Sequence, residues 1–182
     1  MGFLGHRLEK IRKDSDFFTW FHLEETGTPR EEGDRKILTF KPSGETFREL
    51  VTLTITIDGE GRIREMGLAL ARSFVEDSAN GIFARDLVKS LLGAAVPREN
   101  QADVADLANE IEFQSSPGRT VITARQDLPK LPDPPTLGYQ VFLGKEKRYE
   151  QVLTRCIVRL ENSADSGPKS LKICLTDRGS TG

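Results

Sequence analysis

Residues 51–57 carry the pattern that most constrains this chain. Apolar side chains alternate there with threonines, in the order Val51, Thr52, Leu53, Thr54, Ile55, Thr56, Ile57. A period of two is typical of a strand with one buried face. Asp58-Gly59-Glu60-Gly61 follows, and glycine readily adopts the positive φ that tight turns need. Residues 62–70 return with further apolar side chains, so the sequence predicts a β-hairpin over 51–70.

A four-residue turn, 58–61, sets the register that we expect for this hairpin. The expected pairs are Val51 with Leu68, Leu53 with Met66, Thr54 with Glu65, and Thr56 with Ile63. This register collects the apolar residues of both strands on one face, whereas a slip by one residue would set Ile55 opposite Glu65. A lone hairpin is marginal in water, so the apolar face needs a cover and further strands.

A helix is predicted after the hairpin. Asp77-Ser78-Ala79-Asn80 offers good N-cap side chains. The apolar residues that follow at helical spacing are Phe83, Leu87, Val88, Leu91, Leu92 and Ala95. Gly93 is expected to mark the helix end, and Pro97 prevents continuation. We therefore expect an amphipathic helix laid across the apolar face of the hairpin.

A second helix is predicted from residue 100 to residue 111. Asn100 can cap it. Val104, Leu107, Ala108 and Ile111 then give i, i+3, i+4, i+7 spacing. The two helices would form an αα-hairpin that ends at residues 115–118, before a strand over 120–124.

The remaining segments are shorter or more polar. Leu4, Leu8 and Ile11 share one face of a short N-terminal amphipathic helix. We expect a polar loop over 24–34 and strands over 36–40, 139–143, 149–161 and 171–176. In the long strand over 149–161, the residues expected on one face are Val152, Thr154, Cys156, Val158 and Leu160. Prolines concentrated between residues 129 and 135 predict an extended strap.

This order of elements predicts a single α+β domain over residues 1–182. We expect a largely antiparallel sheet of about six to seven strands, with the αα-hairpin on one face and the short N-terminal helix. Residues 1–34 would form that helix, an aromatic arm and a loop, and 35–126 the ββ-hairpin, two helices and a strand. Residues 127–137 would form the strap. The strands of 138–182 would join the same sheet, because this segment is too short for an independent core.

Composition limits the classes of function. The net charge is −2, and 37% of the residues are hydrophobic and 30% charged. These values favour a globular protein with a real core and argue against a general nucleic-acid binder, which has a basic footprint. No apolar run reaches membrane-spanning length, so a cytoplasmic protein without a membrane span is the expectation. Cys156 and Cys174 are expected on opposite faces of their strands, as free thiols.

No residue pattern typical of catalysis is present. His6 and His22 are the only histidines, and neither has ligand spacing with a cysteine or carboxylate. The chain has no nucleophile elbow and no phosphate-binding loop. We therefore expect a protein that is not an enzyme, with no catalytic residue, no metal and no cofactor.

Two weaker patterns have ordinary alternatives. Asp103, Asp106 and Glu110 form an acidic row that could hold a divalent metal or dock a basic partner. A solvated helix face is the favoured interpretation of this row. Pro129-Lys130-Leu131-Pro132 matches the minimal PxxP pattern, which is common by chance.

Two groups of residues are candidates for partner binding. The first is the aromatic arm Phe17, Phe18, Trp20 and Phe21. Burial in the core is the favoured interpretation of these rings, and an anchor for a partner or a membrane surface is the alternative. The second group is Arg155, Arg159 and Lys172. These could bind an anion, an acidic protein or RNA, although a soluble, edge-protected sheet face is the favoured interpretation.

The leading hypothesis is a non-catalytic protein-interaction module, either chaperone-like or an assembly or adaptor subunit. Its partner would be another protein or a second copy of the chain. The first alternative is a small metal-dependent or anion-binding enzyme that uses the acidic row or the arginines. The second is a nucleic-acid-binding accessory protein, which the overall charge makes the less favoured.

Overall fold

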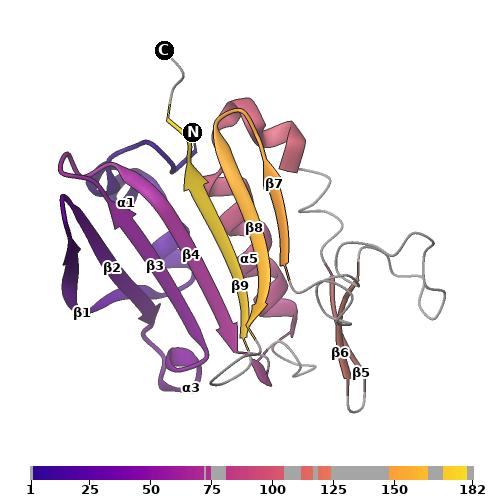
Figure 1. Cartoon of the computed structure of the whole chain (residues 1–182). Helices are drawn as coiled ribbons and strands as arrows, with labels where there is room; N and C mark the ends of the chain where they lie inside the picture. The colour runs from indigo at the N-terminus through magenta and orange to yellow at the C-terminus, as the bar shows by residue number, and fades with distance from the viewer. Residues whose placement is uncertain are drawn as a thin grey trace.

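A seven-stranded antiparallel sheet forms the body of the protein (Figure 1). The computed structural model describes residues 2–71, 73–74, 81–104, 112–116, 119–123, 148–163 and 170–179. The strand order is β1-β2-β3-β4-β9-β8-β7. The strands are β1 (Leu23–Glu32), β2 (Arg35–Pro42), β3 (Val51–Ile57), β4 (Ile63–Ala71), β7 (Arg148–Val152), β8 (Cys156–Ser163) and β9 (Ser170–Asp177). The prediction of an α+β fold on a largely antiparallel sheet is confirmed.

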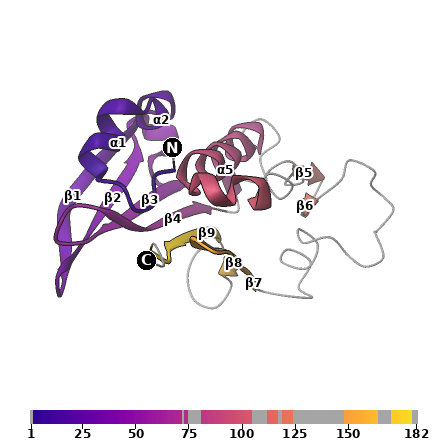
Figure 2. The ribbon, with the colours of Figure 1, turned by 90° about the horizontal axis from the view of Figure 1, so that it is seen from above.

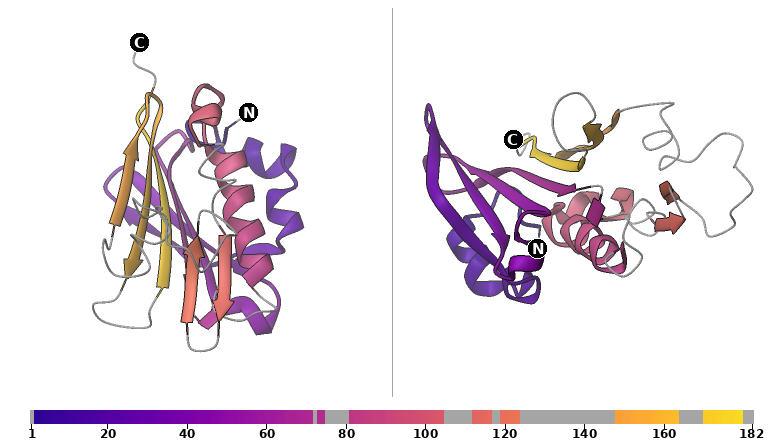
Figure 3. Two further views of the ribbon diagram at one scale, coloured as in Figure 1. Left: turned by 90° about the vertical axis from the view of Figure 1, so that its right-hand side faces the viewer. Right: turned by 90° about the horizontal axis from the view of Figure 1, so that it is seen from below.

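Helices lie against one face of this sheet (Figures 2 and 3). They are α1 (Leu8–Asp14), α2 (Phe17–Trp20), α3 (Glu45–Arg48), α5 (Gly81–Ala95) and the 3-10 helix η1 (Arg98–Asn100). Residues 101–104 are helical, but the rest of the predicted second helix lies outside the described residues, as do the strap over 127–137 and the strand over 139–143. No helix in the described part of the chain is long and apolar enough to cross a membrane.

The core lies between the sheet and its helices. Val51, Leu53 and Ile55 of β3 are fully buried. On α5 the buried residues are Ala84, Leu87, Val88, Leu91, Leu92 and Ala95. The apolar stripe expected on this helix thus packs in one cluster with the apolar face of the hairpin. Phe83 is only partly buried and packs against the margin of that cluster.

The register of the β3–β4 hairpin differs from the expected one by two residues. Val51 pairs with Leu70, Leu53 with Leu68 and Thr54 with Gly67. The predicted register is therefore wrong. An even shift leaves residues 65–70 on their predicted faces, whereas Ile63, which was expected opposite Thr56 on the threonine face, is fully buried. A bulge accounts for one residue of this shift: Thr56 pairs with Glu65 and Ile57 with Ile63, so Arg64 is an extra residue in β4. The turn accounts for the other, because five residues rather than four separate Ile57 from its partner. This bulge lets Ile63 and Met66 both face the core.

The loop predicted over 24–34 is wrong, because β1 occupies most of it and pairs with β2. Only Leu23 at its beginning is buried, so β1 has no apolar alternation by which to recognise it. The register shifts between Thr26 and Arg30, where Gly27 and Pro29 lie. Proline is tolerated at such an edge bulge, since its missing N–H costs no ladder bond there.

The single long strand predicted over 149–161 is also wrong. The chain turns at residues 153–155 and forms β7 and β8, which pair with each other. The Leu153 N–H donates to the Cys156 carbonyl oxygen at 2.8 Å. Asn100, which is buried, accepts from the Arg155 N–H at 2.8 Å on Oδ1 and donates to Thr154 Oγ1 at 2.9 Å. A side chain distant in sequence therefore holds a turn that contains neither glycine nor proline.

The strand predicted over 120–124 corresponds to β6 (Arg119–Thr123), but its partner β5 (Glu112–Ser116) was not expected. These two strands pair in a separate two-stranded sheet rather than joining the main one. The αα-hairpin was expected to end at residues 115–118, but a strand already begins at Glu112. The helical segment therefore ends earlier in the sequence than predicted.

The N-terminal segment ties α5 to the β3–β4 turn. α5 continues past Gly93 to Ala95, so the predicted end at Gly93 is wrong. The Phe3 and Leu4 N–H groups donate to the Ala94 and Ala95 carbonyl oxygens at 3.0 and 3.1 Å. These bonds satisfy carbonyls that a helix end otherwise leaves without partners. The next residues pair with the hairpin, since the Gly5 N–H donates to the Ile63 carbonyl oxygen at 2.8 Å.

Candidate functional site

Three of the four aromatic residues proposed for partner binding lie in the core. Phe17, Phe18 and Phe21 are 7%, 7% and 4% exposed. The Phe18 ring packs against Phe40 of β2, with 5.2 Å between centroids. Trp20 alone is exposed, at 76%. Thr19 and Trp20 form the exposed side of this short helix, whereas its other two residues are buried.

The three basic candidates do not form one patch. Arg155 lies in the turn before β8 and donates to Glu99 Oε1 at 2.9 Å. Arg159 and Lys172 do share the outer face of the sheet, which is the face away from α5. There, Arg159 donates to Glu150 Oε2 across the β7–β8 pair at 3.0 Å. Each arginine therefore has a carboxylate beside it, and the face is a set of opposite charges rather than a basic surface.

The acidic row is only partly described. Asp103 is exposed and accepts from Asn100 Nδ2 at 3.0 Å, whereas Asp106 and Glu110 lie outside the described residues. The same holds for the PxxP segment, 129–132. No three His, Cys, Asp or Glu side chains are grouped as metal ligands within the parts of the chain that the structure describes.

A row of small uncharged residues crosses the outer face of the sheet. Strand pairing aligns Thr26, Thr39, Thr54, Gly67 and Cys174, which we call the neutral row. All five are half-buried. The Thr54 hydroxyl lies over β4, with Oγ1 3.3 Å from the Gly67 carbonyl oxygen. No helix from the described residues covers this face (Figure 3).

The two edges of the sheet differ. β1 carries a bulge, Pro29 and several charged side chains, all devices that discourage pairing with another strand. β7 has a regular register with β8 and no proline. Val152, which the sequence placed on the buried face, is 56% exposed. It lies opposite the half-buried Ile157, so an apolar pair marks this edge on the outer face.

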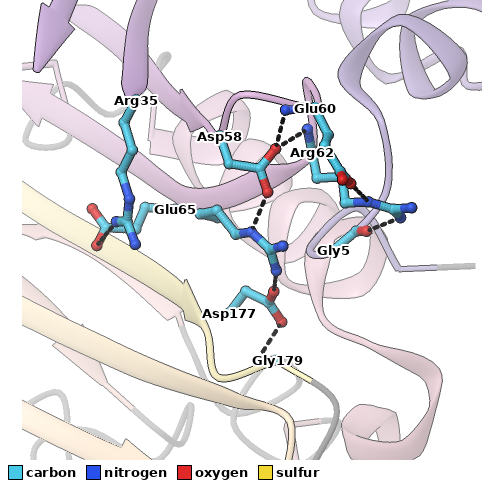
Figure 4. Close-up of polar contacts among 9 residues, drawn as sticks. Gly5, Arg35, Asp58, Glu60, Arg62, Glu65, Asp177 and Gly179 are labelled. Atoms are coloured by element: carbon cyan, nitrogen blue, oxygen red, sulfur yellow. Dashed lines mark hydrogen bonds and ion pairs between the residues drawn. The ribbon is translucent and has the colours of Figure 1, made fainter. Parts of the chain in front are cut away.

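Charged side chains from three segments meet at one end of the sheet (Figure 4). Arg64, the bulge residue, donates from Nε to Asp58 Oδ2 at 2.8 Å and from Nη1 to Asp177 Oδ2 at 2.6 Å. Asp177 is 1% exposed in its side chain and also accepts from the Gly179 N–H. Arg62 joins this polar end by donating to Glu60 and to the Gly5 carbonyl oxygen. The ion pairs of Arg64 thus link the β3–β4 turn to the end of β9, and the hydrogen bond from Arg62 to Gly5 links it to the N-terminal segment.

These contacts shift the acidities of the groups involved. Burial opposes the charged form of Asp58, but the hydrogen bonds it accepts from Arg62, Arg64 and Glu60 outweigh that effect and lower its pKa. The hydrogen bond to Asp177 is the main cause of the raised pKa of Arg64. Both groups therefore stay charged at neutral pH.

Both cysteines are free and face opposite sides of the sheet, as predicted. Cys156 is fully buried, and desolvation, followed by the charges of Asp177 and Asp103, raises its pKa to about 11. Desolvation also raises the pKa of Cys174. A thiol with a raised pKa is protonated at neutral pH and is a poor nucleophile.

Comparison of the chain with protein-family models, with curated proteins and with solved structures finds no match. What the protein does must therefore be inferred from its own residues. The features available for binding are the β7 edge, the neutral row and the polar end of the sheet.

Proposed function

We propose that the protein is a non-catalytic protein-interaction module that receives an extended segment of another protein as an added strand along β7. The observation that carries this proposal is the β7 edge, which no other strand of the described residues pairs, with its exposed Val152. Adding a strand to a free sheet edge is a common mode of peptide recognition, in which main-chain bonds supply affinity and side-chain contacts supply specificity. An adaptor or a chaperone-like protein can use such an edge.

The backbone geometry of β7 supports strand addition. Hydrogen-bonded and non-hydrogen-bonded pairs alternate along an antiparallel ladder. The bond from the Leu153 N–H to the Cys156 carbonyl oxygen marks a hydrogen-bonded position. Val152 and Ile157 are the next pair, so the N–H and C=O of Val152 point away from β8. Among the described strands, none lies on that side of β7.

Side chains near this edge support an apolar anchor in the partner. Val152 and Ile157 together offer adjacent aliphatic surface on the outer face. Glu150 and Arg159 form the next pair on this face, two residues further along, and present both signs of charge. A segment with an aliphatic residue flanked by polar ones fits this arrangement. The raised pKa of the buried Cys156 thiol is in keeping with a non-catalytic role.

A peptide-display selection on the intact protein tests the proposal, with two variants at one position. Val152→Pro removes the outward N–H without removing a ladder bond, whereas Val152→Thr keeps it and changes only the side chain. We expect selection of short segments rich in β-branched residues, binding to be lost in Val152→Pro, and binding to be weakened but retained in Val152→Thr.

Two controls separate the possible outcomes. In the free protein, amide hydrogen exchange should be fast at Val152 and slow at Gln151, whose N–H faces β8; a bound peptide should slow the former. Light scattering tests the competing possibility that a second copy occupies the edge. Selection of no peptide, or equal binding by the proline variant, would rule out strand addition at β7.

A further inference from the structure

A pocket opens at the polar end of the sheet, beside the ion pairs of Figure 4. Its volume is about 400 Å³, and its polar lining comes from His6, Arg62, Arg64, Arg155 and Asp177. A second pocket of about 440 Å³ lies on the other side of His6 and Arg155 and reaches Arg98 and Glu99. His6 and Arg155 therefore lie at the junction of two hollows.

Two polar atoms at this junction have no hydrogen-bond partner. They are His6 Nδ1 and Arg155 Nε, and both atoms are buried. Other side-chain groups around the pocket are paired: Arg62 with Glu60, Arg64 with Asp58 and Asp177, and Arg155 Nη1 with Glu99. Buried polar groups in native proteins nearly always have partners, and an unpartnered one calls for a water, an ion or a ligand. Two such atoms, on two residues that line the same pocket, point to one ligand.

The chemistry of the unpartnered atoms indicates what that ligand is. An arginine Nε–H can only donate, whereas a histidine Nδ1 donates in one tautomer and accepts in the other, so Arg155 decides what the ligand must offer. The ligand must therefore offer acceptor oxygens. The Nε side of a guanidinium forms a planar fork that matches a carboxylate or a phosphate, and Glu99 occupies only Nη1 of Arg155.

The existing ion pairs favour an anion over a cation. Asp177 is the one carboxylate in the lining of the first pocket, and Arg64 and the Gly179 N–H already hold its two oxygens. Three arginines line the same space. A cation entering there would face those guanidinium groups without an unoccupied carboxylate.

We propose that this pocket binds a small oxyanion, a carboxylate or phosphate group, on Arg155 and His6. Arg62 and Arg64 also line this pocket, and their own ion pairs hold them in place. Each binding side chain is partly exposed, since Arg155 retains 29% of its side-chain surface and His6 is half-buried. Because Nε and Nδ1 themselves are buried, binding requires both side chains to turn toward the pocket. This site does not depend on strand addition at β7.

Titration of the intact protein with inorganic phosphate, and separately with acetate, tests the proposal. The readout is the NMR shift of the arginine Nε–H groups together with the affinity from calorimetry. We expect the Arg155 Nε–H signal to move on titration with at least one of the two anions. The anion that binds more tightly identifies the group, phosphate or carboxylate.

Variants separate this site from non-specific attraction. Arg155→Lys keeps the charge beside Glu99 but lacks Nε, and His6→Phe keeps a ring without its nitrogens; each should weaken binding by about tenfold. Arg159→Lys is the matched control, because Arg159 also pairs with a glutamate but lies on the outer face. It should bind as the unaltered chain does. Melting temperature checks that each variant folds.

Three results would overturn the proposal. The first is that neither anion shifts the Arg155 signal, as expected if water alone fills the pocket. The second is that Arg159→Lys weakens binding as much as Arg155→Lys. The third is that both Arg155→Lys and His6→Phe fold and bind with unchanged affinity.

Discussion

The two faces of the sheet are built from the same strands but have opposite properties. On β3, Val51, Leu53 and Ile55 are fully buried under α5 and its neighbours, while the intervening threonines are half-buried on the other side. The covered face is wholly aliphatic along this strand. The outer face has small residues and paired charged side chains where the covered face has large apolar ones. The difference indicates that stability resides on one face, which leaves the other available for contacts.

The largest expected effect comes from the covered face. Leu53→Ala should lower the free energy of unfolding by about 2–5 kcal/mol, because it leaves a cavity in a packed core. Thr54→Ala, one residue away on the outer face, should cost less than about 1 kcal/mol, since it removes only a weak hydroxyl contact. Urea denaturation measures both. Equal losses would show that the outer face is as tightly packed as the core.

A smaller effect is expected within the neutral row. A Cβ added at Gly67 would lie 2.8 Å from Thr54 Oγ1, which is too close. Gly67→Ala should therefore cost about 1–3 kcal/mol through overpacking. Adding Thr54→Ala should recover much of that loss, because it removes the atom in the way. A double-mutant cycle measures the coupling, and strictly additive losses would contradict the close contact.

The ion-paired residues at one end of the sheet, Arg64 with Asp58 and Asp177, belong to neither face. They should make the stability of the protein depend on pH. The pKa of Asp58 is lower in the folded protein than its ordinary value of 3.8. Its contribution to stability is therefore complete above the unfolded pKa and is lost as pH falls through the lower, folded value. In the Asp58→Asn variant, the free energy of unfolding should therefore decrease less steeply as pH falls below about pH 4. Urea midpoints across acidic pH provide the measurement, and an unchanged slope would exclude Asp58 as a contributor.

The smallest perturbation is chemical labelling of the two cysteines, which compares the accessibility of the two faces without altering the sequence. Cys174 is half-buried on the outer face and Cys156 is fully buried on the other. Iodoacetamide should modify Cys174 slowly and should reach Cys156 only when urea unfolds the protein, because burial and a pKa of about 11 both protect it. Peptide mass spectrometry follows the two sites. Labelling of Cys156 first in the native protein would contradict the assignment of faces.

Periodicity in the sequence was enough to locate the central elements. β3, α5, and the buried face of β8 follow from spacing alone, because each packs one regular stripe against the core. β1 could not be found in this way, since its residues lie at an edge where burial imposes no alternation. The β3–β4 register depended in part on the bulge at Arg64, which donates to Asp58 and Asp177, contacts that no hydrophobic pattern records.

The candidate sites were only partly predictable. Arg155 stood out as a basic residue, but its place beside His6 depends on contacts between chain segments far apart in sequence. Val152 was assigned to the buried face because nothing local indicates the turn at 153–155. That turn depends on Asn100, which sequence reasoning assigned to a helix cap. Signals of this kind are non-local, and a single sequence does not contain them.

The pairing of β4 with β9 has a consequence for synthesis of the chain. β4 lies near the middle of the sheet, but its partner β9 is separated from it by roughly a hundred residues, or roughly 5–20 seconds of translation. During that time the nascent chain exposes an aliphatic strand with an unpaired edge, which is a template for aggregation. The sheet is thus completed only after translation of the last strand, and a ribosome stalled before residue 170 would display the protein at its most aggregation-prone.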